Sequence, residues 1–251
     1  MPTLAYTGKQ STGSKECGAY ALTACLLALR KIPAQTTSLT YILPTVETQS
    51  GDTMDSGKVI MRTANVPPSA VKEDLTDPCA QEIYKITGLL QDVKKDVYED
   101  EDVYEDEDED EQAKNPGTYP PVYSNDPDCK GLNPASALAW VAAQLGCTVA
   151  VWVDQDVRDA LNQLYPREEP LLIKMRTSLP KISFVIDDIE PDLPDGAVRL
   201  VLVNDGKHWL AQDSKLRYYD PATGAITEDL PAVYYDGKGN KKITGCYITL
   251  S

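Results

Sequence analysis

The last third of the sequence is a succession of short apolar runs separated by turn residues, and this pattern constrains the fold most strongly. Seven runs follow one another from residue 171, with Pro, Gly and Asp between them: LLIKM, KISFVID, AVRLVLVN, HWLAQ, LRYYD, AVYY and ITGCYITL. The last two flank DGKGNK, which is typical of a hairpin loop. Because strands with short connections pair in opposite directions, the pattern predicts an antiparallel β-sheet at the C-terminal end.

Helical signals come mostly before these runs. Residues 16–31 (ECGAYALTACLLALRK) combine many Ala and Leu residues with an apolar stripe at helical spacing. Asn133 and Pro134 predict the N-cap and first position of another helix. Two further helices and one buried strand are predicted at residues 78–90, 155–165 and, for the strand, 148–154. Residues 33–75 show no periodicity that we can interpret. Helices first and strands last predict an α+β fold.

Residues 91–117 are dominated by charge, unlike the segments on either side. Within them, residues 96–111 (DVYEDEDVYEDEDEDE) contain twelve acids and no base, and the hexapeptide VYEDED occurs twice in tandem. Such a run repels itself and cannot bury apolar surface. We therefore expect an acidic, solvated insertion in a single domain that spans residues 1–251. Tyr98 and Tyr104 are candidate modification sites within it, or part of a docking tail for a basic partner.

The charge of the 251-residue chain argues against two classes of partner. The formal net charge is −15, and it would be −3 without the twelve acids of that run. No basic face is therefore expected to bind nucleic acid or an anionic membrane surface. No apolar run approaches the roughly 20 residues of a membrane span, and MPTLAYTGKQ lacks the pattern of a secretory signal. We expect a cytoplasmic protein, or an effector translocated without a conventional signal peptide.

The sequence has six cysteines and one histidine, and these limit the catalytic and metal-binding chemistry that it can support. The cysteines are irregularly spaced and form no CxxC pair, so we expect mostly reduced thiols. Zinc sites use clusters of Cys and His, and the sequence has none, so neither a metal nor another cofactor is expected. His208, the only histidine, is the one candidate of its type for general-base catalysis near neutral pH.

His208 and Asp220 lie in two consecutive predicted strands. If residues 213–215 form the loop, Gln212 pairs with Leu216, and His208 lies directly opposite Asp220 on one face. Side chains in that arrangement have Cβ atoms about 4.5–5.5 Å apart, close enough for a carboxylate to orient an imidazole. A two-residue loop would put them on opposite faces. A turn-initiating role for Asp220 before proline and a structural role for His208 are the alternatives.

Cys17 is the candidate nucleophile. It opens the apolar helix, where unpaired backbone N–H groups and the helix dipole stabilise a thiolate. Gly18 follows it and allows close approach of a substrate or of backbone. Cys25 lies within the apolar stripe and is interpreted as a core residue, whereas Cys79 and Cys129 lie in segments that are harder to interpret and stay candidates. The alternative for Cys17 is a buried free cysteine.

Two blocks of the sequence resemble papain-like cysteine peptidases, most closely the C39-like branch. QSTGSKECGAYALTACLLAL resembles the nucleophile segment, in which a Gln precedes an acidic residue, Cys and Gly at a helix start; here these are Gln10 and residues 16–18. RLVLVNDGKHWLAQDSKLRYYDPATG resembles the other half, with His and an aromatic residue at a strand start and Asp-Pro-x-x-Gly after the next strand. The order Cys, His, Asp is also the papain-like order.

The resemblance implies a nucleophile helix packed on an antiparallel sheet that carries a histidine and an aspartate. It implies a Cys17–His208–Asp220 triad that cleaves a protein or peptide substrate through a thioester, with Gln10 and the Cys17 backbone N–H as oxyanion donors. Trp209 is either a wall of the cleft or a core residue. The same triad serves a glutamine deamidase or a transglutaminase-like acyl transferase. A non-enzymatic module that binds a basic partner through the acidic run is the alternative from another class.

Overall fold

The structure, a computed structural model, describes residues 1–43, 60–91, 122–124, 128, 130–165 and 167–251. Most of the predicted acidic insertion, with Tyr98 and Tyr104, lies outside the described residues, and so does Cys129. The segments that carry Gln10, Cys17, His208 and Asp220 are described.

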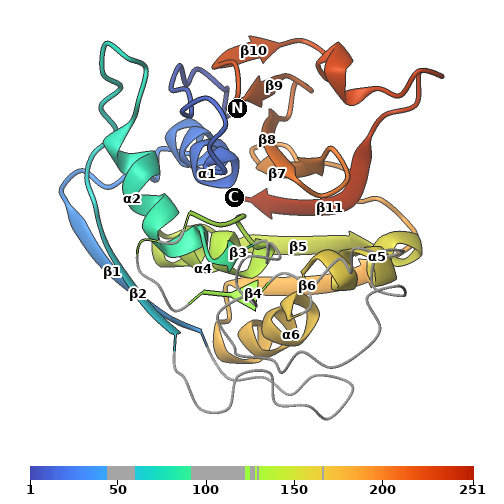
Figure 1. Ribbon diagram of the computed structural model, residues 1–251, viewed down its shortest axis with the longest axis horizontal. Helices are drawn as coiled ribbons and strands as arrows, with labels where there is room; N and C mark the ends of the chain where they lie inside the picture. Colours follow the sequence, from blue (N-terminus) through green and yellow to red (C-terminus); the bar gives the residue numbers. More distant parts are fainter. Residues whose placement is uncertain (44–59, 92–121, 125–127, 129, 166) are drawn as a thin grey trace, which may run out of the picture.

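A seven-stranded sheet in the order β10-β9-β8-β7-β11-β5-β6 forms the centre of the fold (Figure 1). All neighbours in this sheet are antiparallel except β5 and β6. In chain order the strands are β5 (Val149–Asp154), β6 (Ile182–Asp187), β7 (Val198–Val203), β8 (His208–Asp213), β9 (Tyr218–Asp220), β10 (Ala225–Thr227) and β11 (Ile243–Leu250). The prediction of an α+β fold with a mainly antiparallel C-terminal sheet is confirmed, and the parallel pair at its edge was not predicted.

The helix α1 (Cys17–Ala28) packs against β7 and β8 (Figure 1). Its residues from Cys17 to Leu26 are all buried, not only one stripe, because the sheet and two further helices surround it. A helix that is apolar on every side is typical of such a central position. The predicted nucleophile helix is therefore confirmed as an element, and it lies at the middle of the core.

Two helices complete the layer around α1. They are α2 (Pro78–Thr87) and α4 (Ala135–Gln144), and both correspond to predicted helices. The start of α4 differs from the prediction: Pro134 is the N-cap residue, and the Asn133 side chain does not cap the helix. Instead, the Glu168 carboxylate accepts hydrogen bonds from the backbone N–H and the hydroxyl of Ser136.

Two of the predicted strands are helical in the structure. LLIKM belongs to α6 (Glu168–Ser178), which follows a 3-10 turn η2 (Gln155–Val157) and α5 (Arg158–Leu164) in the connection from β5 to β6. Because β5 and β6 are parallel, their connection must cross over the sheet, and helices suit that path. A short apolar run cannot by itself distinguish a buried strand from a buried helix.

The second wrong strand is AVYY, which lies in the 3-10 helix η3 (Ala232–Tyr234) and the residue after it. One bridge between Tyr235 and Lys241 closes the turn that follows. The predicted pair across DGKGNK is thereby reduced to a single bridge. The short strand β10 was not predicted either.

Residues 33–75, which the sequence did not explain, contain two strands. β1 (Thr37–Leu43) and β2 (Ile60–Val66) pair along their whole length as an antiparallel two-stranded sheet. Their residues alternate between buried and exposed, as expected where one face covers a core and the other faces solvent. A smaller two-stranded sheet joins β3 (Leu90–Gln91) to β4 (Val122–Tyr123).

Candidate active site

Cys17 is the first residue of α1 and is almost completely buried, with 2% of its surface exposed. Among the described residues, no side chain caps this helix end. Glu16, the residue at the N-cap position, instead accepts hydrogen bonds from the Ser11 backbone N–H and the Ser14 hydroxyl. The backbone N–H groups of the first turn therefore remain able to stabilise a negative charge on the Cys17 sulfur.

The hairpin of β8 and β9 brings Asp220 to His208, with a register that differs from the prediction. Ala211 pairs with Tyr219, and Gln212 pairs with Tyr218. The pairing is thus shifted by two residues, and direct opposition of His208 and Asp220 was wrong. The loop nevertheless has an odd number of residues, so both side chains keep the same face and His208 Nε2 lies 2.9 Å from Asp220 Oδ1.

The shift comes from Asp213, which was expected in the loop. Its backbone N–H donates to the Arg217 carbonyl, so Asp213 belongs to the ladder and the loop becomes residues 214–216. The Asp213 carboxylate accepts backbone N–H groups from Lys215 and Arg217 and also binds the Arg217 guanidinium. This set of bonds within the turn fixes the loop one residue later than the sequence suggested.

The Asp220 carboxylate is a buried acceptor with three donors. Besides His208, it accepts the Ala222 backbone N–H (2.9 Å) and the Tyr234 hydroxyl (2.9 Å). Burial alone would raise the pKa of Asp220, but the hydrogen bond and charge of His208, with these other donors, lower it below its usual value. Asp220 is therefore held as a carboxylate.

His208 is buried as well, and it faces both Asp220 and Cys17. Burial alone would lower its pKa, but hydrogen bonds and charge interactions with Asp220 and Cys17 outweigh burial and raise the pKa to about 9. Cys17 Sγ also lies 4.0 Å from the carbonyl oxygen of Lys207, the residue before His208. The structure thus brings together three of the four predicted site residues.

Gln10, the fourth predicted site residue, reaches the same region through its backbone. Its N–H donates to the carbonyl of Pro221, which follows Asp220. Its side-chain Nε2 donates to the Ser14 carbonyl (3.3 Å), and its Oε1 is buried without a partner among the described residues. Gln10 thus lies beside the site, and its side-chain amide bonds to the segment that precedes Cys17.

Tyr234 is a site residue that the sequence analysis missed. Its ring stacks on the His208 imidazole, with centroids 5.6 Å apart and planes 16° from parallel, and its hydroxyl donates to Asp220 Oδ2. It comes from η3, in the segment mistaken for a strand. A tyrosine in an aromatic run carries no spacing that relates it to His208, so no sequence signal could have found it.

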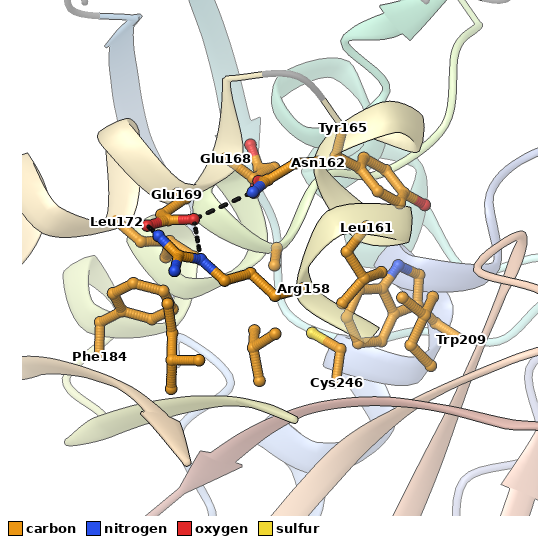
Figure 2. Close-up of a pocket in the computed structure, with 14 residues that line it drawn as sticks. Arg158, Leu161, Asn162, Tyr165, Glu168, Glu169, Leu172, Phe184, Trp209 and Cys246 are labelled. Carbon is orange, nitrogen blue, oxygen red and sulfur yellow. Dashed lines mark hydrogen bonds and ion pairs between the residues drawn. The ribbon is translucent and has the colours of Figure 1, made fainter. Parts of the chain in front are cut away.

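Trp209 points to the other side of the strand and belongs to the main core. Its indole N–H donates to the Asn133 carbonyl (2.9 Å). It also lines a small apolar cavity of about 40 Å³ beneath α5 and α6, where Figure 2 shows the Arg158–Glu169 ion pair on the opposite side from Trp209. The core interpretation of Trp209 is thus confirmed, and the cavity wall is a second role in packing.

The other described cysteines do not resemble nucleophiles. Burial raises the pKa of each thiol: to about 12 for Cys79 and Cys246, to about 11 for Cys147, and well above the ordinary value for Cys25. All four are free and buried. Cys246, which lines the cavity in Figure 2, is thus held as a neutral thiol.

Two further properties concern the described part of the chain as a whole. No helix there combines the length and apolar character that a membrane crossing requires. Clusters of three or more His, Cys, Asp or Glu side chains suited to a metal ion are also absent from these residues.

Comparison with known proteins identifies a family for this chain. A protein-family model described as invasion plasmid antigen J, cysteine protease, matches residues 9–251. Neither the curated proteins nor the solved structures contain a match. The matched range includes the segment of Cys17 and the hairpin of His208 and Asp220. Because it covers nearly the whole chain, the protein belongs to the invasion plasmid antigen J family of cysteine proteases.

Proposed function

We propose that this cysteine protease cleaves peptide bonds with a Cys17–His208–Asp220 triad, through a thioester intermediate. One observation carries the proposal: the chain's only histidine bonds a buried carboxylate at 2.9 Å and also interacts with a cysteine at a helix N-terminus. A nucleophile, a base and a group that orients the base are the parts that acyl transfer requires.

The two ring nitrogens of His208 have different partners. Nε2 is engaged by Asp220, so Nδ1 is the nitrogen left to exchange a proton with Cys17. Proton transfer from the thiol gives a thiolate and an imidazolium, which the Asp220 carboxylate and the end of α1 stabilise. The raised pKa of His208, about 9, favours this charged form at neutral pH.

In the first half of the reaction, the Cys17 thiolate attacks the substrate carbonyl carbon and a tetrahedral oxyanion forms. The Cys17 backbone N–H donates to this oxygen, and Gln10 supplies a second donor when its Nε2 turns from the Ser14 carbonyl. Loss of one such donor typically costs about 3–4 kcal/mol of transition-state stabilisation. His208 then protonates the leaving amine, the C–N bond breaks, and a thioester remains on Cys17.

In the second half, His208 removes a proton from water, which attacks the thioester carbonyl. The C–S bond breaks, the carboxylic acid product leaves, and Cys17 is regenerated. The family match favours water as the acceptor over the amine of an acyl transferase, and a protease over a non-enzymatic binding module. Deamidation of glutamine is the remaining alternative on the same residues.

Four other predictions stay proposals. They are the likeness to C39-like peptidases, the single domain over residues 1–251, the basic partner of the acidic run, and the place of action. For the last, the family's description as an invasion antigen favours a translocated effector over a protein that acts in the cytoplasm of its own cell.

The proposal is tested by the alkylation of Cys17 with iodoacetamide from pH 5 to pH 9, followed by peptide mass spectrometry. We expect wild type to react at pH 6, and His208→Ala to react at least about ten-fold more slowly there. A proteome-derived peptide library then tests cleavage, with Cys17→Ser as the inactive control. A wild-type rate at pH 6 that His208→Ala leaves unchanged would contradict the triad.

A further inference from the structure

Asn133 bonds to residues beside Cys17 and beside His208, although it is not itself part of the proposed triad. It is 1% exposed, and its side-chain Nδ2 donates to the carbonyl of Lys15 at 2.6 Å. Its own backbone carbonyl accepts the indole N–H of Trp209 at 2.9 Å. Lys15 lies two residues before Cys17, and Trp209 directly follows His208. One residue therefore links the segment of the nucleophile to the strand of the histidine.

The orientation of the Asn133 amide is fixed by the Lys15 carbonyl, which can only accept, so that Nδ2 must face it. The other end of the amide makes a third bond: its Oδ1 accepts the hydroxyl of Thr87, the last residue of α2, at 2.6 Å. Both ends of a buried amide are thus satisfied, and a change at either end leaves a polar group without a partner.

Capping does not explain this asparagine. An Asn before Pro at a helix start ordinarily serves as the N-cap, yet here the Glu168 carboxylate accepts the Ser136 backbone N–H and hydroxyl at that end of α4. The Asn133 side chain is released from the helix that it precedes and turns to Lys15 and Thr87.

Gly18 shows how closely the three segments meet. A Cβ atom at Gly18 would lie 2.5 Å from Asn133 Cβ and 3.1 Å from Trp209 Cδ1. No side chain fits there, because Asn133 and Trp209 already occupy the space beside the first turn of α1. At Gly18, where close approach of a substrate or of backbone was predicted, the structure has the side chains of these two residues, and they pack against the first turn of α1.

We infer that Asn133 is a positioning residue, which holds the N-terminal end of α1 and the start of β8 at the separation that the Cys17–His208 pair needs. The inference rests on the proposed function. Misplacement of reacting groups by 1 Å can cost two orders of magnitude in rate. Asn133 acts through Lys15 and Trp209, and it does not itself touch the reacting atoms.

The test uses the full chain and the rate of Cys17 alkylation by iodoacetamide. Asn133→Leu keeps the branched shape of the side chain and removes both hydrogen bonds of the amide, whereas Trp209→Phe keeps an aromatic ring but removes the indole N–H together with part of the buried ring system. We expect rates at pH 6 to fall about ten-fold and about three-fold, respectively. Ser136→Ala is the matched control: it removes a buried hydrogen bond three residues along, outside this contact, and its rate should stay within about two-fold of wild type.

The pH profile separates positioning from a loss of stability. For Asn133→Leu, alkylation should recover only at alkaline pH, while the thermal unfolding midpoint shows that the variant is folded. If that variant does not fold, Thr87→Val removes only the hydrogen bond to Asn133 Oδ1, and a rate about three-fold lower at pH 6 is expected. Unchanged rates at pH 6 in every folded variant would overturn the inference.

A double variant gives the sharpest result. If Asn133 works as a link, breaking it at one end uncouples the two segments, and Asn133→Leu/Trp209→Phe should be no slower than Asn133→Leu alone. If the rate of the double variant falls by the product of the two single-variant factors, Asn133 and Trp209 act independently, and the inference is overturned. Failure of the proposed function is distinguishable, because wild-type Cys17 would then either be unreactive at pH 6 or react there at the same rate in His208→Ala.

Discussion

His208 and Asp220 come from one hairpin of the C-terminal sheet, and hydrogen bonds made near that hairpin hold them together. Cys17, in contrast, lies at the start of a helix near the other end of the chain. The histidine side has a buried carboxylate with three donors and a stacked tyrosine. The nucleophile side has an uncapped helix end and contacts to Asn133. The first side is pre-organised by local bonds, and the second depends on packing between distant segments.

Substitutions at the two sides should therefore have different effects on the protein. A change at the histidine side should alter the protonation of His208 while the fold stays intact, because the bonds involved, apart from the interaction with Cys17, lie between residues 208 and 234. A change at the nucleophile side should alter stability and reactivity together, because α1 lies in the middle of the core.

The largest effect is expected for Asp220→Asn. The variant keeps the size of the side chain but removes the charge that stabilises the imidazolium, so the pKa of His208 should fall toward its ordinary value. Loss of the orienting carboxylate should lower kcat/KM by about 10²- to 10⁴-fold. The pKa is measured by NMR titration of the only histidine, and kcat/KM by cleavage of a peptide selected from the library. A His208 pKa that stays near 9 would contradict the assignment of Asp220.

The next effect concerns pH. Because the pKa of His208 is raised to about 9 in the folded protein, His208 binds its proton more tightly there than in the unfolded chain. Its contribution to stability is complete below about pH 6.5 and is lost as the pH rises through about 9. Cleavage should decline over the same alkaline range as the imidazolium disappears. Urea unfolding at pH 6 and pH 9.5 measures this, and His208→Gln should remove this part of the pH dependence.

A smaller effect is expected for Tyr234→Phe, which keeps the ring on His208 and removes the hydroxyl from Asp220. A hydrogen bond to a charged group contributes about 1.5–3 kcal/mol, so the free energy of unfolding should fall by about that amount. Since one donor to the carboxylate is lost, the pKa of Asp220 should rise. Tyr235→Phe, at the neighbouring tyrosine, is the control. Equal losses in both variants would show that the Asp220 bond has no special role.

The sequence predicted the meeting of these two regions better than it predicted their details. The apolar run after Cys17 predicted a helix and the runs around His208 predicted neighbouring strands, and both predictions are confirmed. An odd number of loop residues places Asp220 on the same face as His208, and the three-residue length assumed for the loop was correct. The exact register was not, because the Asp213 carboxylate binds its own turn and moves the loop by one residue.

What escaped the sequence analysis depends on contacts between distant segments. At the start of α4, the Glu168 carboxylate from another helix takes the place expected for the Asn133 side chain, which bonds to Lys15 instead. Tyr234 is related to His208 only through the path of the chain after β10. The run LLIKM is helical because its neighbouring strands are parallel, which no local pattern reveals.

The smallest predicted effect lies in the loop that sets the register of the histidine side. Leu216 is 58% exposed and has a φ of +62°, a left-handed conformation that leucine adopts at a cost of about 1–2 kcal/mol. Glycine adopts it without that cost but loses more chain entropy on folding. Leu216→Gly should therefore raise the free energy of unfolding by only about 0.5–1 kcal/mol.

Activity should not change in Leu216→Gly, because the Asp213 bonds to Lys215 and Arg217 use backbone groups and hold the register without the leucine side chain. Urea unfolding and the alkylation rate of Cys17 measure the two quantities. A more stable protein with an unchanged rate supports local pre-organisation of the histidine side. A lower rate would mean that the loop transmits its conformation to His208, and the contrast between the two sides would then be weaker than the bonds suggest.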